Sequence, residues 1–87
     1  MPTNTAVKLE VAVVYNGVTK EIQAEAQQRV VALLQRAIHE FGVTQQPHLL
    51  SLFRQDGTKV EEQQSVAEAG LLTGTLLLLR PDAVKGG

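Results

Sequence analysis

The stretch VKLEVAVVYNGVTKEIQA, residues 7–24, decides the fold class. Apolar residues alternate through both halves, which is the period of a half-buried strand. Between the halves stands Asn16-Gly17, the pair that favours a type I′ turn because both central residues take positive φ. Lys20 falls on the apolar face of the second strand and is expected near its edge. The stretch therefore predicts a β-hairpin, whose apolar face carries Leu9, Val11, Val13, Tyr15, Val18, Ile22 and Ala24.

The next stretch, residues 27–41, changes to a helical period. Its apolar stripe predicts a helix of about four turns. Gly42 follows as the residue that ends the helix, and Val43 is placed for the apolar contact that accompanies such a cap. No Ser, Thr, Asp or Asn stands where an N-cap is expected. The stripe consists of Val30, Leu34, Ala37 and Phe41.

The last third of the chain predicts short elements joined by tight turns. Residues 49–54 and 75–80 read as strands, and a short strand is expected around Val60 after an Asp56-Gly57 turn. Ser65-Val66-Ala67-Glu68 is a capping box, which predicts a one-turn helix closed by Gly70. A single helix crossing one face of a mixed sheet is an α+β roll. The first and last strands are expected side by side at its centre, where near-continuous hydrophobicity is tolerated.

This order divides the chain into three parts. Residues 1–6 predict a disordered arm, residues 7–80 one domain, and residues 81–87 a flexible tail that contains Gly86-Gly87. A length of 87 residues leaves no room for a second domain.

The composition excludes several classes of function. Without cysteine there is no disulfide, thiolate metal site or cysteine nucleophile, and eight basic against nine acidic residues give no footprint for nucleic acid. No apolar run approaches a membrane span, and no signal pattern opens the chain, so a cytoplasmic protein without a membrane partner is expected. His39 and His48 are isolated, and no catalytic, phosphate-binding or metal-binding spacing is present. We therefore expect no enzyme, no metal site and no cofactor bound by the protein itself.

The order of elements and their residues resembles the ubiquitin-like β-grasp family from residue 7 to residue 87. The most specific part runs from Lys59-Val60-Glu61-Glu62 through residues 65–71 and 75–80 to Gly86-Gly87. The resemblance implies an α+β ubiquitin-like β-grasp roll, with a mixed sheet of four to five strands and one main helix packed across one face. The absence of cysteine and the alanine-rich composition look like the ubiquitin-like modifiers of bacteria.

The resemblance also implies a function for the diglycine. The Gly87 carboxylate would be adenylated with ATP by a partner activating enzyme, passed as a thioester and joined by a conjugating enzyme to a lysine of a target protein. A deconjugating protease is a further implied partner. Gly86 and Gly87 suit this role because residues without Cβ pass a narrow channel in almost any conformation. Arg80 and Lys85 are expected either to pair with acidic residues of the activating enzyme or to remain two solvated charges.

A recognition surface is predicted from the strand alternation. If Leu76 and Leu78 face the helix, Leu77 and Leu79 face away from it. The resemblance places Phe53 inward. The predicted partner-binding patch then consists of Leu50, Leu52, Leu77 and Leu79, with Arg54 beside them. Such a patch marks an interface with a partner or a second copy, or is covered by a neighbouring domain or the arm.

Two other functions remain open at this point. Sulfur carriers share the fold and the diglycine but form a C-terminal thiocarboxylate, and Pro81-Asp82-Ala83-Val84 is not unlike their tails. A non-conjugated interaction module would not need Gly86-Gly87. The Asn16-Gly17 hairpin and the capped turn over residues 65–70 favour the modifier. Chain formation is not supported, because the predicted helix carries no lysine, and Lys8, Lys20 and Lys59 match no acceptor motif.

Overall fold

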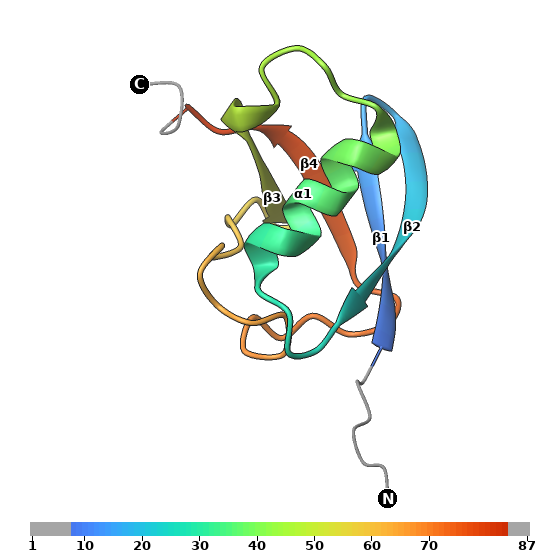
Figure 1. Cartoon of the computed structure of the whole chain (residues 1–87), viewed down its shortest axis with the longest axis vertical. Coiled ribbons are helices and arrows are strands. Elements are labelled where there is room, and N and C mark those ends of the chain that lie inside the picture. Colours follow the sequence, from blue (N-terminus) through green and yellow to red (C-terminus); the bar gives the residue numbers. More distant parts are fainter. Residues whose placement is uncertain (1–7, 84–87) are drawn as a thin grey trace, which may run out of the picture.

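The computed structural model describes residues 8–83, in which one helix packs across one face of a four-stranded sheet (Figure 1). The strand order is β2-β1-β4-β3. β1 and β4 are parallel neighbours at the centre, and both outer pairs are antiparallel. The α+β roll and its central strand pair are therefore confirmed, whereas residues 1–6 lie outside the described part. The elements are β1 (Lys8–Tyr15), β2 (Val18–Glu25), α1 (Val30–Phe41), the 3₁₀ helix η1 (Pro47–Leu49), β3 (Leu50–Arg54) and β4 (Leu76–Pro81).

The hairpin forms as its sequence predicts. Asn16 and Gly17 have φ values of 53° and 80°, as a type I′ turn requires, and Tyr15 pairs with Val18 across it. Lys20 lies opposite Val13 on the face that carries the helix. Its Nζ donates a hydrogen bond of 2.9 Å to the Glu40 carbonyl, so this charge sits at the edge of the core, as expected.

The helix ends as predicted but starts three residues late. Gly42, at φ 65°, donates its N–H to the His39 carbonyl, and Val43 donates to the Ile38 carbonyl, which is a Schellman cap. At the other end no side chain caps the helix. The backbone N–H groups of Val30 and Val31 instead donate to carbonyls of a distant loop, those of Gln64 and Glu62. Because the groups that cap the helix come from residues far away in the sequence, no local motif predicts where the helix begins.

Residues 27–29 stay outside the helix because their backbone bonds elsewhere. Arg29 forms an isolated bridge with Ser65, and the Gln28 carbonyl accepts the Val66 N–H at 2.8 Å.

The capping box is reciprocal, as predicted: Glu68 N–H donates to Ser65 Oγ, and Ser65 N–H donates to Glu68 Oε1, each at 3.0 Å. Residues 66–70 form a hydrogen-bonded turn in place of the predicted one-turn helix, and Gly70 closes it at φ 76°.

The predicted short strand around Val60 is wrong as a strand. Only a single bridge joins Phe53 and Lys59, although Val60 N–H donates to the Leu52 carbonyl. The Asp56-Gly57 turn before it is confirmed by a φ of 93° at Gly57 and a hydrogen bond from its N–H to the Arg54 carbonyl. The sheet therefore has four strands among residues 8–83.

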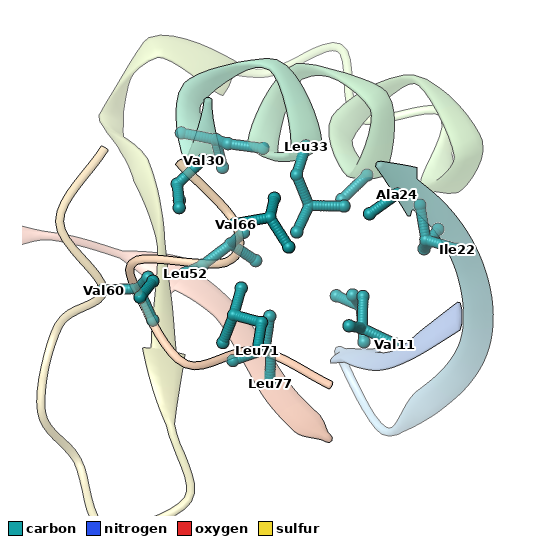
Figure 2. Packing of buried hydrophobic residues seen from close by; sticks show 14 of the residues in the cluster. Val11, Ile22, Ala24, Val30, Leu33, Leu52, Val60, Val66, Leu71 and Leu77 are labelled. Atoms are coloured by element: carbon teal, nitrogen blue, oxygen red, sulfur yellow. The ribbon is translucent and has the colours of Figure 1, made fainter. Parts of the chain in front are cut away.

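The core lies between the sheet and α1 and is aliphatic (Figure 2). It contains the helix residues Val30 and Leu33, and Val60, Val66 and Leu71 from the long connection between β3 and β4. It also contains four residues that were predicted to be exposed, namely Leu50, Leu52, Leu77 and Leu79. The predicted phase of β3 and β4 is therefore wrong.

The reason for this error is the leucine run of β4. Four consecutive leucines carry no alternation, so their phase depends on the neighbouring strands. Leu77 pairs with Val13 of β1, whose side chain faces the helix, and Leu79 pairs with Leu52 of β3. Pairing partners share a face, so Leu77 and Leu79 point inward. Phe53, which was expected inward, takes the opposite face.

The domain extends beyond its predicted limit at residue 80. β4 includes Pro81, which pairs with Leu50 at the end of the strand, where its missing N–H is tolerated. Asp82 follows with only 6% of its surface exposed, and its N–H donates to the Leu49 carbonyl at 2.8 Å. The first residues of the predicted tail thus belong to the fold. No helix among residues 8–83 is long and apolar enough to cross a membrane.

Candidate functional site

The sheet face opposite α1 carries a row of partly exposed apolar side chains. We call this set the outer face, and it consists of Ala12, Val14, Phe53, Leu76 and Leu78. Ala12 pairs with Leu76, Val14 with Leu78, and Phe53 with Leu78, so neighbouring strands place these side chains next to one another. The predicted patch is therefore wrong in its residues: β3 and β4 expose the alternate side chains Phe53, Leu76 and Leu78, and β1 adds Ala12 and Val14.

Arg80 lies at the C-terminal end of the outer face. Its guanidinium carbon is 4.7 Å from the centre of the Phe53 ring, a cation–π contact between β4 and β3. The Arg80 side chain is exposed, so its charge remains available beside the apolar row. Its predicted pairing with acidic residues of an activating enzyme stays a prediction.

Arg54, the fifth residue of the predicted partner-binding patch, is also placed elsewhere. It is partly buried, and its Nη2 donates a hydrogen bond of 2.9 Å to the Ala69 carbonyl. The guanidinium thus holds the turn over residues 65–70 against the end of β3. With its four leucines buried, that patch is not a surface on which a partner can dock.

A polar cluster stands where the chain leaves the sheet. We call it the exit cluster, and it consists of Ser51, Lys59, Glu62 and Asp82. Lys59 Nζ lies 2.7 Å from Asp82 Oδ2, and Ser51 Oγ lies 3.2 Å from the same oxygen and 3.1 Å from Glu62 Oε2. A hydroxyl has one proton, so Ser51 donates to one carboxylate at a time. Ser51 is fully buried, whereas the Lys59 side chain is 36% exposed.

The carboxylates of the exit cluster favour the protonated form of Lys59. The hydrogen bond to Asp82 raises the pKa of Lys59 above its ordinary value. Desolvation opposes this shift, and the negative charges of Asp82, Glu62 and Glu61 add to it. This cluster was not predicted from the sequence, because Asp82 reads there as part of a tail beyond the last strand. The available signal was Ser51, a polar residue between two leucines of a predicted strand.

The remaining predicted site residues fall on a part of the chain that the structure does not describe. Lys85, Gly86 and Gly87 lie outside the described residues. His39 and His48 are exposed. Within residues 8–83 there is no group of three or more His, Cys, Asp or Glu side chains that could hold a metal ion. Two hollows of about 250 and 240 Å³ share Lys8 and Gln23, at the opposite end of the sheet from the exit cluster.

Comparison with solved structures shows the fold. A designed protein based on ubiquitin matches with a TM-score of 0.74 at 19% identity, over 87% of this chain and 90% of its own. The N-terminal ubiquitin-like domain of the 4931431F19Rik protein matches with a TM-score of 0.75 at 13% identity, over 94% of this chain and 82% of its own. The chain therefore has a ubiquitin-like β-grasp fold.

A third structure places the same fold in a larger protein. ATBAG1, solved in complex with HSP70, matches with a TM-score of 0.74 at 17% identity, over 90% of this chain but 42% of its own. No curated protein matches the chain. The family described as Protein of Unknown function (DUF2604) matches residues 4–87. Since this match covers almost the whole sequence, the chain belongs to the DUF2604 family.

Proposed function

We propose that this protein is a ubiquitin-like modifier, a substrate and carrier rather than an enzyme, that acts in the cytoplasm in a bacterial conjugation pathway. The observation that carries the proposal is a diglycine, Gly86-Gly87, placed shortly after the last strand of a ubiquitin-like fold. The fold supplies a stable body, and residues 83–87 provide a segment whose glycines lack side chains. The reacting group is the Gly87 carboxylate, free as synthesised or after trimming.

The chemistry proceeds on partner enzymes. A carboxylate oxygen of Gly87 attacks the α-phosphorus of ATP, and pyrophosphate leaves. A cysteine thiolate of the activating enzyme then attacks the acyl carbon, forming a thioester and releasing AMP. After transfer to a conjugating enzyme, the amine of a target lysine attacks the thioester, loses a proton, expels the thiolate and forms an isopeptide bond. A deconjugating protease hydrolyses that bond, and the protein itself binds no cofactor.

The outer face is the surface that we assign to the activating enzyme. Its five apolar side chains are contiguous, and exposed contiguous apolar surface on a small domain usually marks an interface. Arg80 adds a positive charge at one end, above the Phe53 ring. The complementary partner surface is apolar with a carboxylate facing Arg80, because matched charges orient an encounter and exclude wrong partners. This proposal is supported by the position of Arg80, at the end of the outer face where the chain leaves the sheet.

A second candidate is a non-conjugated interaction module. It is supported by the match to ATBAG1, in which the same fold makes up less than half of the solved chain. Such a module would also use the outer face but would not need Gly86-Gly87. Deletion of Gly86-Gly87 would therefore abolish the function of a modifier but not that of an interaction module.

The test uses the protein with an N-terminal tag, expressed in its native host with and without Gly86-Gly87. After purification under denaturing conditions, intact mass and tryptic peptides are measured. Trypsin cleaves after Lys85, so a conjugated target keeps Gly-Gly on its modified lysine. We expect this remnant only with the intact diglycine. A free protein with sulfur in place of one carboxylate oxygen would show a sulfur carrier, and the absence of both species would favour the interaction module.

The role of the outer face is tested with two leucine substitutions. Leu78→Asp places a charge in the middle of the outer face, whereas Leu72→Asp changes a leucine that is 68% exposed and lies outside it. We expect Leu78→Asp to reduce the conjugates while the folded structure, followed by circular dichroism, is kept. Equal conjugate levels in the two variants would remove the outer face from the mechanism.

A further inference from the structure

Asp82 is held by the domain through both its backbone and its side chain. Its N–H donates to the carbonyl of Leu49, directly before β3. Its carboxylate contacts the Lys59 ammonium at 2.7 Å and the buried Ser51 hydroxyl at 3.2 Å. The chain is therefore fixed at a position beyond the last residue of β4. A tail that began at the end of the strand would need none of these contacts.

Lys59 is the cation among the contacts of Asp82 in the exit cluster. Two carboxylates, Asp82 and Glu62, approach the same Ser51 hydroxyl, and Lys59 supplies the positive charge of the cluster. Carboxylates that share a site repel each other more strongly when a neighbouring cation is removed, and burial then disfavours the charged carboxylate relative to one in water. Loss of the Lys59 charge therefore favours movement of Asp82 out of its site and into solvent.

We propose that the exit cluster is a latch that sets where the tail begins, and thereby the reach of the Gly87 carboxylate. This inference rests on the proposed function. With the latch closed, the five residues 83–87 span at most about 17 Å when fully extended. With the latch open, residue 82 joins them and the limit rises to about 20 Å, because Pro81 still pairs with Leu50. Asp82, Lys59 and Ser51 are positioning residues, since they act on the reacting carboxylate through the point at which the chain leaves the domain.

The latch itself is tested by amide hydrogen exchange measured by NMR on the whole protein. Lys59→Met keeps most of the aliphatic side chain and removes the charge, and Lys8→Met is the matched control at the other end of the sheet. We expect exchange of the Asp82 amide to accelerate at least about tenfold in Lys59→Met, because opening becomes local and frequent. The Ala12 amide, which bonds to the Thr75 carbonyl, is expected to be unchanged. Equal acceleration of both amides, or no acceleration at Asp82, would overturn the latch.

The delivery role is tested by shortening the tail and then opening the latch. Deleting Val84 removes about 3.3 Å of reach. Because misplacement of a reacting group by about 1 Å can lower a rate about 100-fold, this deletion is expected to reduce Gly-Gly remnants about 10- to 100-fold. Adding Lys59→Met to the deletion is expected to restore most of the loss, since release of residue 82 returns about 3.3 Å of reach. Lys8→Met is expected to restore nothing.

This rescue separates positioning from stability. A residue that only stabilises the fold would deepen the loss when it is replaced, whereas an opened latch reverses it. Remnants that stay low in the Lys59→Met deletion variant would overturn the delivery role and leave the modifier function standing. If the unmodified protein gives no remnant at all, the modifier function and the delivery role both fail, and amide exchange still decides whether the latch exists.

Discussion

Replacing Leu77 by alanine is expected to destabilise the domain strongly, whereas the same change at the adjacent Leu78 is expected to have a small effect. Leu77 is fully buried and pairs with Val13 on one side and Arg54 on the other, at the centre of the sheet. Leu78 is only partly buried and belongs to the outer face. The two residues have the same chemistry and adjacent positions, so the comparison isolates the effect of the face on which each lies.

The magnitude follows from the burial. Leu→Ala at a fully buried site costs about 2–5 kcal/mol, which combines the lost transfer free energy with the cavity left behind. A domain of this length has a free energy of unfolding of about 4–13 kcal/mol, so Leu77→Ala removes a large part of it. At a partly exposed site we expect about 1 kcal/mol or less, because less apolar surface is returned to water.

The assay is equilibrium unfolding in urea, followed by far-ultraviolet circular dichroism. The midpoint is expected to fall much further for Leu77→Ala than for Leu78→Ala, with a similar dependence on urea concentration in both. The phase predicted from the sequence gives the opposite order, with Leu77 exposed and Leu78 in the core. A larger loss for Leu78→Ala would therefore refute the phase of β4 and with it the outer face.

Three further outcomes are expected. Ser65→Ala is expected to lower the free energy of unfolding by about 1 kcal/mol in urea titrations, because the Glu68 N–H loses its acceptor. Gln64→Ala, at an exposed residue, is the control. Equally small changes in the two variants would contradict the capping box. Gly42→Ala is expected to lower the free energy of unfolding by about 1–2 kcal/mol, because φ is 65° at this position. The cost comes from the backbone conformation, since the added Cβ meets no atom within 4 Å. An unchanged urea midpoint would argue against the left-handed cap. Hydrogen bonds from the Thr58 hydroxyl and N–H hold the pKa of Asp56 below its ordinary value of 3.8. The contribution of Asp56 to stability is therefore present above pH 3.8 and is lost as the pH falls through the lowered pKa of the folded state. The thermal unfolding midpoints of Asp56→Asn and the unmodified protein should converge in that acidic range, and a difference that stays constant with pH would contradict this prediction.

Local signals in the sequence identified most elements of the fold. The Asn16-Gly17 turn, the end of the helix at Gly42 and the capping box at Ser65 each depend on a few adjacent residues, and all three appear in the structure. The order of these elements fixes the α+β class. The start of α1 was placed too early because its cap comes from the carbonyls of residues 62 and 64, which a local pattern does not reveal.

The candidate site was less predictable, because it depends on pairing between strands. The leucines of β4 give no phase by themselves, and only their register with β1 and β3 decides which of them face the helix. Asp82 likewise reads as a loop residue until Lys59 and Ser51, distant in sequence, are placed beside it. The stacking of Arg80 on Phe53 joins two strands in the same way. Tertiary contacts therefore determine the site far more than they determine the element types.

The central position of β4 has a consequence for how the domain is completed. The last strand along the chain lies between β1 and β3, so a chain cut before Leu76 loses the middle of its sheet and not an edge. β1 then has no neighbour on one side, and β3 has no strand partner. Pairing of the first and last strands closes a long loop, which slows folding relative to local contacts. An incomplete chain can therefore form the hairpin and parts of the helix but cannot assemble the sheet, and only a domain with β4 in place holds Asp82 beside Lys59 and Ser51.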